Sequence, residues 1–163
     1  MDNRYIKYIE TPLGTMEILS TSKGITDINF LKNREPYNER KTNQDPNAVE
    51  YAHLAAVQLT EYFDGKRTTF DIPLHLEGTS FQRRVWKAML TIPYGHTASY
   101  GEIAIKAGSP KAFRAAGGAC GKNPISIIIP CHRIIASNGK IGGFSSGLHR
   151  KKWLLQHEAK LQR

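Results

Sequence analysis

A cysteine, a histidine and an arginine follow one another in the segment ISIIIPCHRII, between two runs of isoleucine. Cys131 offers a thiol, and His132 offers a base that could take the proton of that thiol. A free thiol of pKa ~8.5 is only a few per cent thiolate at neutral pH, so a nucleophilic cysteine needs such a base. The segment therefore predicts either a nucleophile held at a pocket or an inert cysteine buried beside a turn.

Composition places these residues in a globular protein. The chain has 163 residues, of which 40% are hydrophobic and 23% charged, enough for one domain or two small ones. It contains no apolar run near the ~18 residues of a membrane span, and its N-terminus lacks a signal-peptide pattern. We therefore expect a cytoplasmic protein, and we also expect a monomer. Because Cys120 and Cys131 are its two cysteines, we expect no disulfide framework.

Charge is divided unevenly along the chain. Residues 1–75 carry 9 Lys and Arg against 11 Asp and Glu, a net charge of −2, whereas residues 76–163 carry 14 against 3, a net charge of +11. A basic excess confined to one half indicates a polyanionic partner, most simply nucleic acid. A solvated basic face is the alternative interpretation.

The acidic half has the pattern of a small α/β unit. Alternating apolar residues and glycine-containing turns predict an antiparallel meander over residues 5–10, 15–21 and 25–31. A polar loop is expected over 32–46, then a helix from Asn47 that is closed by Gly65, then a short strand over 68–74. Nothing in this half predicts chemistry, so we expect it to act as a scaffold.

The basic half is predicted to be mostly helical, with a helix-turn-helix at its centre. An amphipathic helix is expected before Pro93, and the Ser99–Glu102 capping box starts a second helix that ends near Gly108. Ser109 followed by Pro110 is the start signal of a third helix. A short buried strand over 125–135, interrupted at Pro130, is expected next. A glycine- and serine-rich loop over 137–150 and a last helix over 149–162 complete this half.

The third of these helices is made of small residues, AAGGA, with one long side chain at Arg114. Each glycine costs a helix ~1 kcal/mol relative to alanine. A helix that reads bases in the major groove would carry several Arg, Asn or Gln side chains. The small residues therefore indicate either close packing on another helix or close approach to a narrow minor groove.

With these motifs in place, the chain resembles the O6-alkylguanine-DNA alkyltransferases, the methylated-DNA–protein-cysteine methyltransferases. The resemblance runs from about Phe81 to Glu158 and rests on SY, FRAAGG, NP, PCHRII and WLLQHE in that order. It implies an α+β fold. Residues 1–75 would form a ribonuclease-H-like scaffold with a small antiparallel sheet and a helix, and residues 76–163 a mostly helical DNA-binding and alkyl-acceptor domain.

The resemblance also implies a function and a role for individual residues. The protein would repair double-stranded DNA by moving the alkyl group of O6-alkylguanine irreversibly to Cys131, once per molecule and without a cofactor; O4-alkylthymine is a second candidate substrate. His132 and Glu158 would relay the thiol proton, Asn123 would brace the turn, and Tyr100 would donate to the base and contact a phosphate. Arg114 would replace the flipped guanine in the base stack. The remaining implied contacts are to DNA at Ser109, Ser137, Gln82 and Arg133, and to the alkylated base at Phe144, Ser145 and Ser146.

The sequence departs from the family pattern at a few positions. It has no cysteine before Cys120, so the structural zinc of some relatives is not expected. Phe144 stands where many relatives have tyrosine, and Ser146 where glycine is frequent. A non-catalytic branch carries tryptophan in place of the cysteine, and Cys131 argues against membership of it.

Three other interpretations of the chain remain. A DNA-binding or regulatory module would explain the charge but not the PCHR segment. A cysteine hydrolase would use Cys131 and His132 but would turn over and ignore DNA. An inert buried Cys131 is the third, and methyl transfer to the protein would separate all three from the alkyltransferase.

Overall fold

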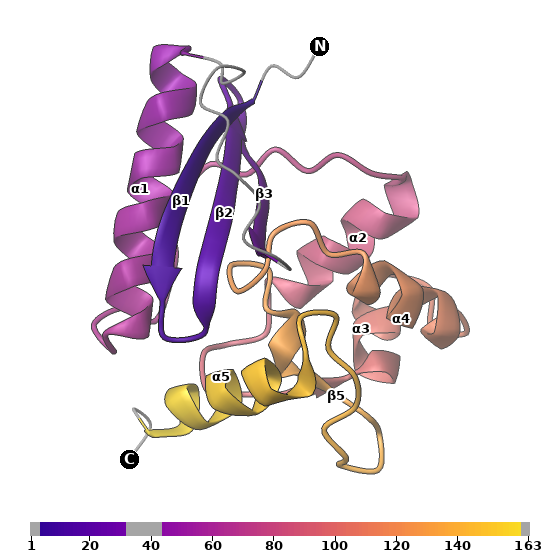
Figure 1. The fold of residues 1–163 in the computed structure, drawn as a ribbon. Coiled ribbons are helices and arrows are strands. Elements are labelled where there is room, and N and C mark those ends of the chain that lie inside the picture. The colour runs from indigo at the N-terminus through magenta and orange to yellow at the C-terminus, as the bar shows by residue number, and fades with distance from the viewer. Residues whose placement is uncertain (1–3, 32–43, 161–163) are drawn as a thin grey trace. The chain divides into compact units, whose positions relative to one another are not determined.

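The computed structural model describes residues 4–31 and 44–160, which divide into two compact units at Glu77 and Gly78 (Figure 1). The fold is α+β, as the sequence predicts. The loop predicted for 32–46 lies mainly outside the described residues. Within them, no helix is both long and apolar enough to cross a bilayer.

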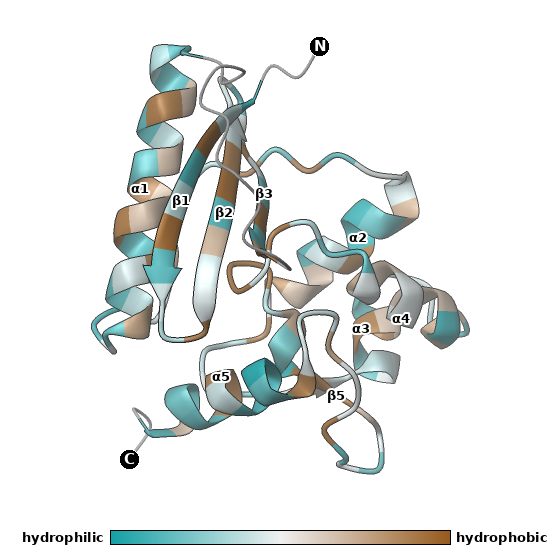
Figure 2. Ribbon diagram, in the orientation of Figure 1, coloured by the Kyte–Doolittle hydropathy of each residue, from teal (hydrophilic) through white to brown (hydrophobic). Residues whose placement is uncertain are grey.

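The first unit is a three-stranded antiparallel sheet packed against one helix. Strands β1 (Tyr5–Thr11), β2 (Gly14–Thr21) and β3 (Gly24–Phe30) lie in sequence order. Figure 2 shows hydrophobic and hydrophilic residues alternating along β1 and β2, the period that gives a strand one buried face. The helix α1 (Pro46–Phe63) contacts all three strands. It begins where Asp45 caps the backbone N–H groups of Asn47 and Ala48.

One predicted element of this unit is wrong. The strand expected over 68–74 is absent, and only Leu74 forms an isolated bridge to Ile25 of β3. The neighbouring backbone is held at Gly24, where a side-chain Cβ would lie 2.6 Å from the carbonyl oxygen of Pro73. Gly24 has φ +144°, so both its conformation and its surroundings require glycine.

The described part of the second unit contains four α-helices and a two-residue parallel pairing. These are α2 (Ser80–Met89), α3 (Tyr100–Lys106), α4 (Phe113–Gly121) and α5 (Leu148–Lys160), with β4 (Ala98–Ser99) beside β5 (Ile134–Ile135). α2, α3 and α4 pack on one another, and the Trp86 indole N–H donates to the Ala119 carbonyl at 2.9 Å. The predicted helix-turn-helix is α3 and α4.

The start of α4 differs from the prediction. Ser109 and Pro110 form a turn in which the Ala112 N–H bonds the Ser109 carbonyl, and the helix begins at Phe113 without a side-chain cap. Gly108, at φ +81°, ends the preceding helix in the left-handed conformation. The capping residue Ser99 does start α3, because its hydroxyl accepts from the Glu102 N–H at 3.1 Å.

Candidate active site

Cys131 is the first residue of a 3₁₀ helix, Cys131–Arg133, that follows Pro130 and leads into β5. The strand predicted before Pro130 is instead a tight turn. The Asn123 side chain closes this turn, accepting from the Ile125 N–H at 2.9 Å and donating to the Ile129 carbonyl at 2.8 Å. The Cys131 N–H then donates to the same Ile129 carbonyl. The predicted brace of Asn123 therefore has a physical basis at this position.

The turn holds one residue in an unfavourable conformation. Ile127 is fully buried and has φ +74°, a region that a β-branched residue rarely occupies. Such a residue costs about 1–3 kcal/mol and persists only where its surroundings fix it. The isoleucines of this segment are buried, and their packing fixes the backbone in this conformation. Packing, and not the local conformational preference of the chain, therefore sets the position of Cys131.

His132 and Glu158 form a buried pair next to the thiol. The Nε2 atom of His132 lies 2.7 Å from Oε2 of Glu158, and the two side chains are 0% and 1% exposed. Burial lowers the pKa of His132, so the ring is neutral at neutral pH. A carboxylate only accepts hydrogen bonds, so Nε2 must carry the proton and Nδ1 the lone pair. Among the described residues Nδ1 has no hydrogen-bond partner, which leaves it free to act as a base.

Arg133 does not have the position expected of a DNA contact. Its guanidinium is buried and donates to both oxygens of Glu158, from Nε at 2.8 Å and from Nη2 at 3.0 Å, and to the Ile92 carbonyl at 2.7 Å. Burial alone would raise the pKa of Glu158, but the hydrogen bonds from His132 and Arg133 outweigh burial and lower it. These contacts assign Arg133 another role, because it keeps Glu158 ionised and in place, and its predicted contact with DNA stays a prediction.

The surroundings of Cys131 act on its pKa in both directions. Burial raises the pKa of the thiol, while a hydrogen bond with Asn123, the charge of Lys151 and nearby backbone N–H groups lower it, and burial prevails. Cys131 is therefore a thiol at rest and must lose its proton during a reaction. The same groups that oppose burial would stabilise the thiolate once it forms.

Lys151 is a site residue that the sequence analysis missed. It is fully buried, and its ammonium donates to the carbonyls of Ile134, at 2.5 Å, and Gly143, at 3.1 Å. It thereby joins β5 to the loop that walls the site, and it places a positive charge near the thiol. The helical spacing of Lys151, Leu154 and Glu158 on the buried face of α5 is the sequence signal that could have found it.

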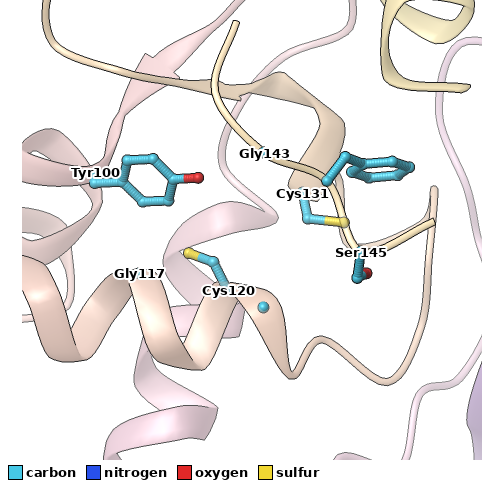
Figure 3. Close-up of a pocket in the computed structure, with 8 residues that line it drawn as sticks. Tyr100, Gly117, Cys120, Cys131, Gly143 and Ser145 are labelled. Atoms are coloured by element: carbon cyan, nitrogen blue, oxygen red, sulfur yellow. The ribbon is translucent and has the colours of Figure 1, made fainter. Parts of the chain in front are cut away.

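Of these groups, Cys131 lines a pocket of about 260 Å³. Small-molecule sites usually measure ~300–1,000 Å³, so the pocket suits a small ligand. Figure 3 shows the Tyr100 ring and the sulfur atoms of Cys131 and Cys120 directed into this space. The lining residues are Tyr100, Gly117, Cys120, Gly121, Cys131, Gly143, Phe144 and Ser145. The predicted pocket residues Phe144 and Ser145 thus line the pocket, and Ser146 does not.

Two other titratable groups of the pocket stay protonated. Burial, and then the neighbouring thiols, raise the pKa of Tyr100. Burial, followed by the charge of Cys131, raises the pKa of Cys120 to about 12. Tyr100 can therefore donate a hydrogen bond across the pocket, and Cys120 is a poor nucleophile although it shares the pocket with Cys131.

The residues predicted to contact DNA lie at several places in the second unit. Arg114 is exposed in the first turn of α4, Ser109 is half-buried in the turn before it, and Ser137 is exposed in the turn after β5. The Gln82 side-chain oxygen accepts from the Thr79 N–H at 3.0 Å and so caps α2. Its amide N–H₂ remains available as a donor.

The glycines of α4 are not explained by internal packing. A Cβ at Gly118 or Gly121 would meet nothing within 4 Å, and one at Gly117 would make only ordinary contact with the Tyr100 ring. Close packing on another helix of this unit therefore does not require glycine at positions 118 and 121. The smooth exposed face of α4 is left for something outside the unit.

Comparison with known proteins agrees with this geometry. Residues 80–160 match the DNA binding domain of the 6-O-methylguanine DNA methyltransferases, and residues 4–76 match their ribonuclease-like domain. The chain belongs to this family. The resemblance predicted from PCHR and its surrounding motifs is thus confirmed, and the family match extends to the first unit.

Relatives that match over nearly the whole chain carry one name. A methylated-DNA–protein-cysteine methyltransferase of Methanosarcina barkeri is 46% identical over 154 residues, which is 94% of this chain and 96% of that protein. One of Mycobacterium tuberculosis is 44% identical over 154 residues, covering 94% and 92%. The crystal structure of Mycobacterium tuberculosis OGT in complex with DNA superposes with a TM-score of 0.83 at 43% identity, over 96% of this chain and 94% of that one.

Proposed function

We propose that this protein repairs alkylated double-stranded DNA by transferring the alkyl group of O6-alkylguanine to the sulfur of Cys131, irreversibly and once per molecule. The names and the DNA complex of its relatives support this proposal. The observation that carries it is the neutral, buried His132, oriented by Glu158, beside a thiol at the edge of a small pocket. O4-alkylthymine would be a second substrate if the pocket accepts a pyrimidine.

The proposed reaction begins with removal of the thiol proton. The lone pair on Nδ1 of His132 takes the proton from Cys131, through one water molecule, and Glu158 stabilises the resulting imidazolium. Lys151 and Asn123 stabilise the thiolate. The sulfur attacks the alkyl carbon; an S–C bond forms as the C–O bond to guanine breaks.

Guanine needs a hydrogen-bond donor as it leaves. The protonated Tyr100 hydroxyl faces the pocket and donates to the base while negative charge develops there. The thiol proton returns to guanine by way of His132 and solvent, so the products are neutral guanine and an S-alkylcysteine. The product is a thioether, which thiol exchange does not reverse, so the protein acts as a stoichiometric reagent.

The alkylated oxygen lies inside a stacked duplex, so the nucleotide must be extruded. We propose that α4 enters the minor groove with its small-residue face and that Arg114 fills the place of the extruded base. Ser109, Ser137 and the Gln82 amide would contact the backbone. Lesions occur in any sequence, and an α4 face without base-reading side chains suits that need.

The roles of the two units follow. We propose that residues 76–163 bind DNA and accept the alkyl group, and that residues 1–75 serve as scaffold. The residues that line the pocket all belong to the second unit, and we propose that the protein acts as a monomer. A reaction that needs a free thiol suits the reducing cytoplasm.

Intact-protein mass spectrometry after mixing with a duplex containing one O6-methylguanine tests the proposal. We expect one added methyl group per protein, mapped to Cys131, and none in Cys131→Ala. Cys120→Ala is the matched control, because its thiol shares the pocket but is a poor nucleophile. Binding of the duplex without a mass increase would leave a lesion-binding module, and repeated turnover would indicate a hydrolase.

A further inference from the structure

Phe113 has an unusual position. It is 52% exposed, and among the described Phe, Tyr and Trp residues it is the one whose side chain is exposed and not buried or half-buried. It is the first residue of α4 and directly precedes the exposed Arg114. Neither the pocket nor the internal packing of the helix-turn-helix explains a phenyl ring left in water at this position.

The helical spacing of α4 relates Phe113 to the pocket. The residues of α4 that line the pocket are Gly117, Cys120 and Gly121, which lie four, seven and eight positions after Phe113. Residues at these spacings share one helix face, so Phe113 continues the pocket-lining stripe to the N-terminal end of α4. A helical side chain leans toward the N-terminus, so the phenyl ring lies at the outer rim of the stripe.

The charge around this rim indicates what covers it. Exposed cations surround Phe113 in the sequence, with Lys111 and Arg114 beside it and Lys122 at the other end of α4. An apolar ring between cations is poorly suited to a protein core but matches a stacked nucleic acid, whose phosphates are anionic and whose bases are flat and apolar.

We propose that Phe113 is a second wedge beside Arg114, inserted from the minor groove against the base that flanks the extruded nucleotide. This inference rests on the proposed function. Extrusion leaves a gap next to a base that has lost one stacking partner; the Arg114 guanidinium occupies the gap, and the phenyl ring covers the exposed face of the neighbour. Phenylalanine is among the side chains that proteins insert between base steps in this way.

Alkyl-transfer rates from three substrates test the wedge. Phe113→Ala and the wild type react with O6-methylguanine in a duplex, in a single strand of the same sequence and as the free base. We expect the duplex rate, relative to the free-base rate, to fall about 5- to 150-fold, the range that alanine substitution costs at a base-stacking aromatic residue. Phe113→Trp keeps a stacking ring and should stay within a few-fold of the wild type.

Leu90→Ala is the matched control, since Leu90 is 40% exposed in the same unit but lies at the end of α2. The wedge is overturned if Phe113→Ala keeps the wild-type ratio within twofold, or if Leu90→Ala loses as much. It is also overturned if the free base or the single strand shows the same loss as the duplex. Failure of the wild type to methylate Cys131 would reject the proposed function itself, and this inference with it.

Discussion

At the scale of single residues, the hydrogen bond between His132 and Glu158 determines which ring nitrogen of His132 can act as a base. Glu158 accepts hydrogen bonds from His132, from Arg133 and from the Gly95 N–H, so it stays ionised although it is buried. Its charge fixes the proton of His132 on Nε2. The one remaining basic atom of the ring is Nδ1, and neutral His132 is the form that can act.

The pH dependence of transfer follows from this pair. Burial lowers the pKa of His132 below its ordinary value of 6.5, so the base is neutral at every pH above that value. We expect the single-turnover rate with the free base O6-methylguanine to be flat from pH 6.5 to 8 and to fall only in more acidic solution, as His132 becomes protonated. Stopped samples analysed by intact mass give the rate. A rate that halves at or above pH 6.5 would contradict the assignment.

At the scale of elements, α4 combines a poor helix-forming sequence with an open surface. Glycine in a helix interior costs about 0.5–1 kcal/mol relative to alanine. At Gly118 the protein gains no packing in return, because a Cβ there would meet nothing within 4 Å. A stability cost without an internal benefit is explained if the surface of α4 must approach DNA closely.

Substitutions at Gly118 separate stability from binding. Gly118→Ala should raise the free energy of unfolding by about 0.5–1 kcal/mol, measured by urea denaturation. Gly118→Leu should fold as well as the wild type but lose at least tenfold in duplex affinity, measured by fluorescence anisotropy, because its side chain fills the face that enters the groove.

Gly24→Ala provides the opposite control, since its Cβ would collide with the Pro73 carbonyl and its φ is positive, so this variant should be destabilised. Wild-type duplex affinity in Gly118→Leu would exclude this face of α4 as the DNA contact.

At the scale of the whole molecule, charge is concentrated in the second unit. Its exposed cations are Arg83, Arg84, Lys87, Lys106, Lys111, Arg114, Lys122, Lys140, Lys152 and Lys160. In the described part of this unit, Glu102 is the one exposed acidic residue, and Glu158 is buried. Such a unit should bind the phosphate backbone without regard to sequence.

Salt should therefore weaken binding of the duplex far more than it slows alkyl transfer from the free base. Each phosphate contact adds about −0.9 to the slope of log affinity against log salt, so about two contacts already give a tenfold loss between 50 and 200 mM. We expect at least that loss in anisotropy titrations, and less than a twofold change in transfer from the free base. Lys111→Gln should reduce the slope by about one. An unchanged affinity across this range would rule out backbone binding.

The sequence by itself determined the three-stranded meander, the helices and the candidate reactive residues. Local signals sufficed for α1, whose Asp45 cap and closing Gly65 are adjacent to it in the chain, and for α3, which starts at its Ser99 cap. PCHR and the motifs around it indicated Cys131, His132 and Glu158, because the chemistry needs a thiol, a base and a carboxylate.

Only the tertiary structure decided the partners of charged side chains and the path of irregular backbone. The side chains of Arg133 and Lys151 are buried because hydrogen bonds to groups distant in the chain offset the cost of removing each charge from water. No local sequence pattern reveals these partners. The turn at Ile127 replaced a predicted strand, since burial overrode the preference of isoleucine for extended backbone. Residue types set the chemistry, and long-range packing sets which atoms meet.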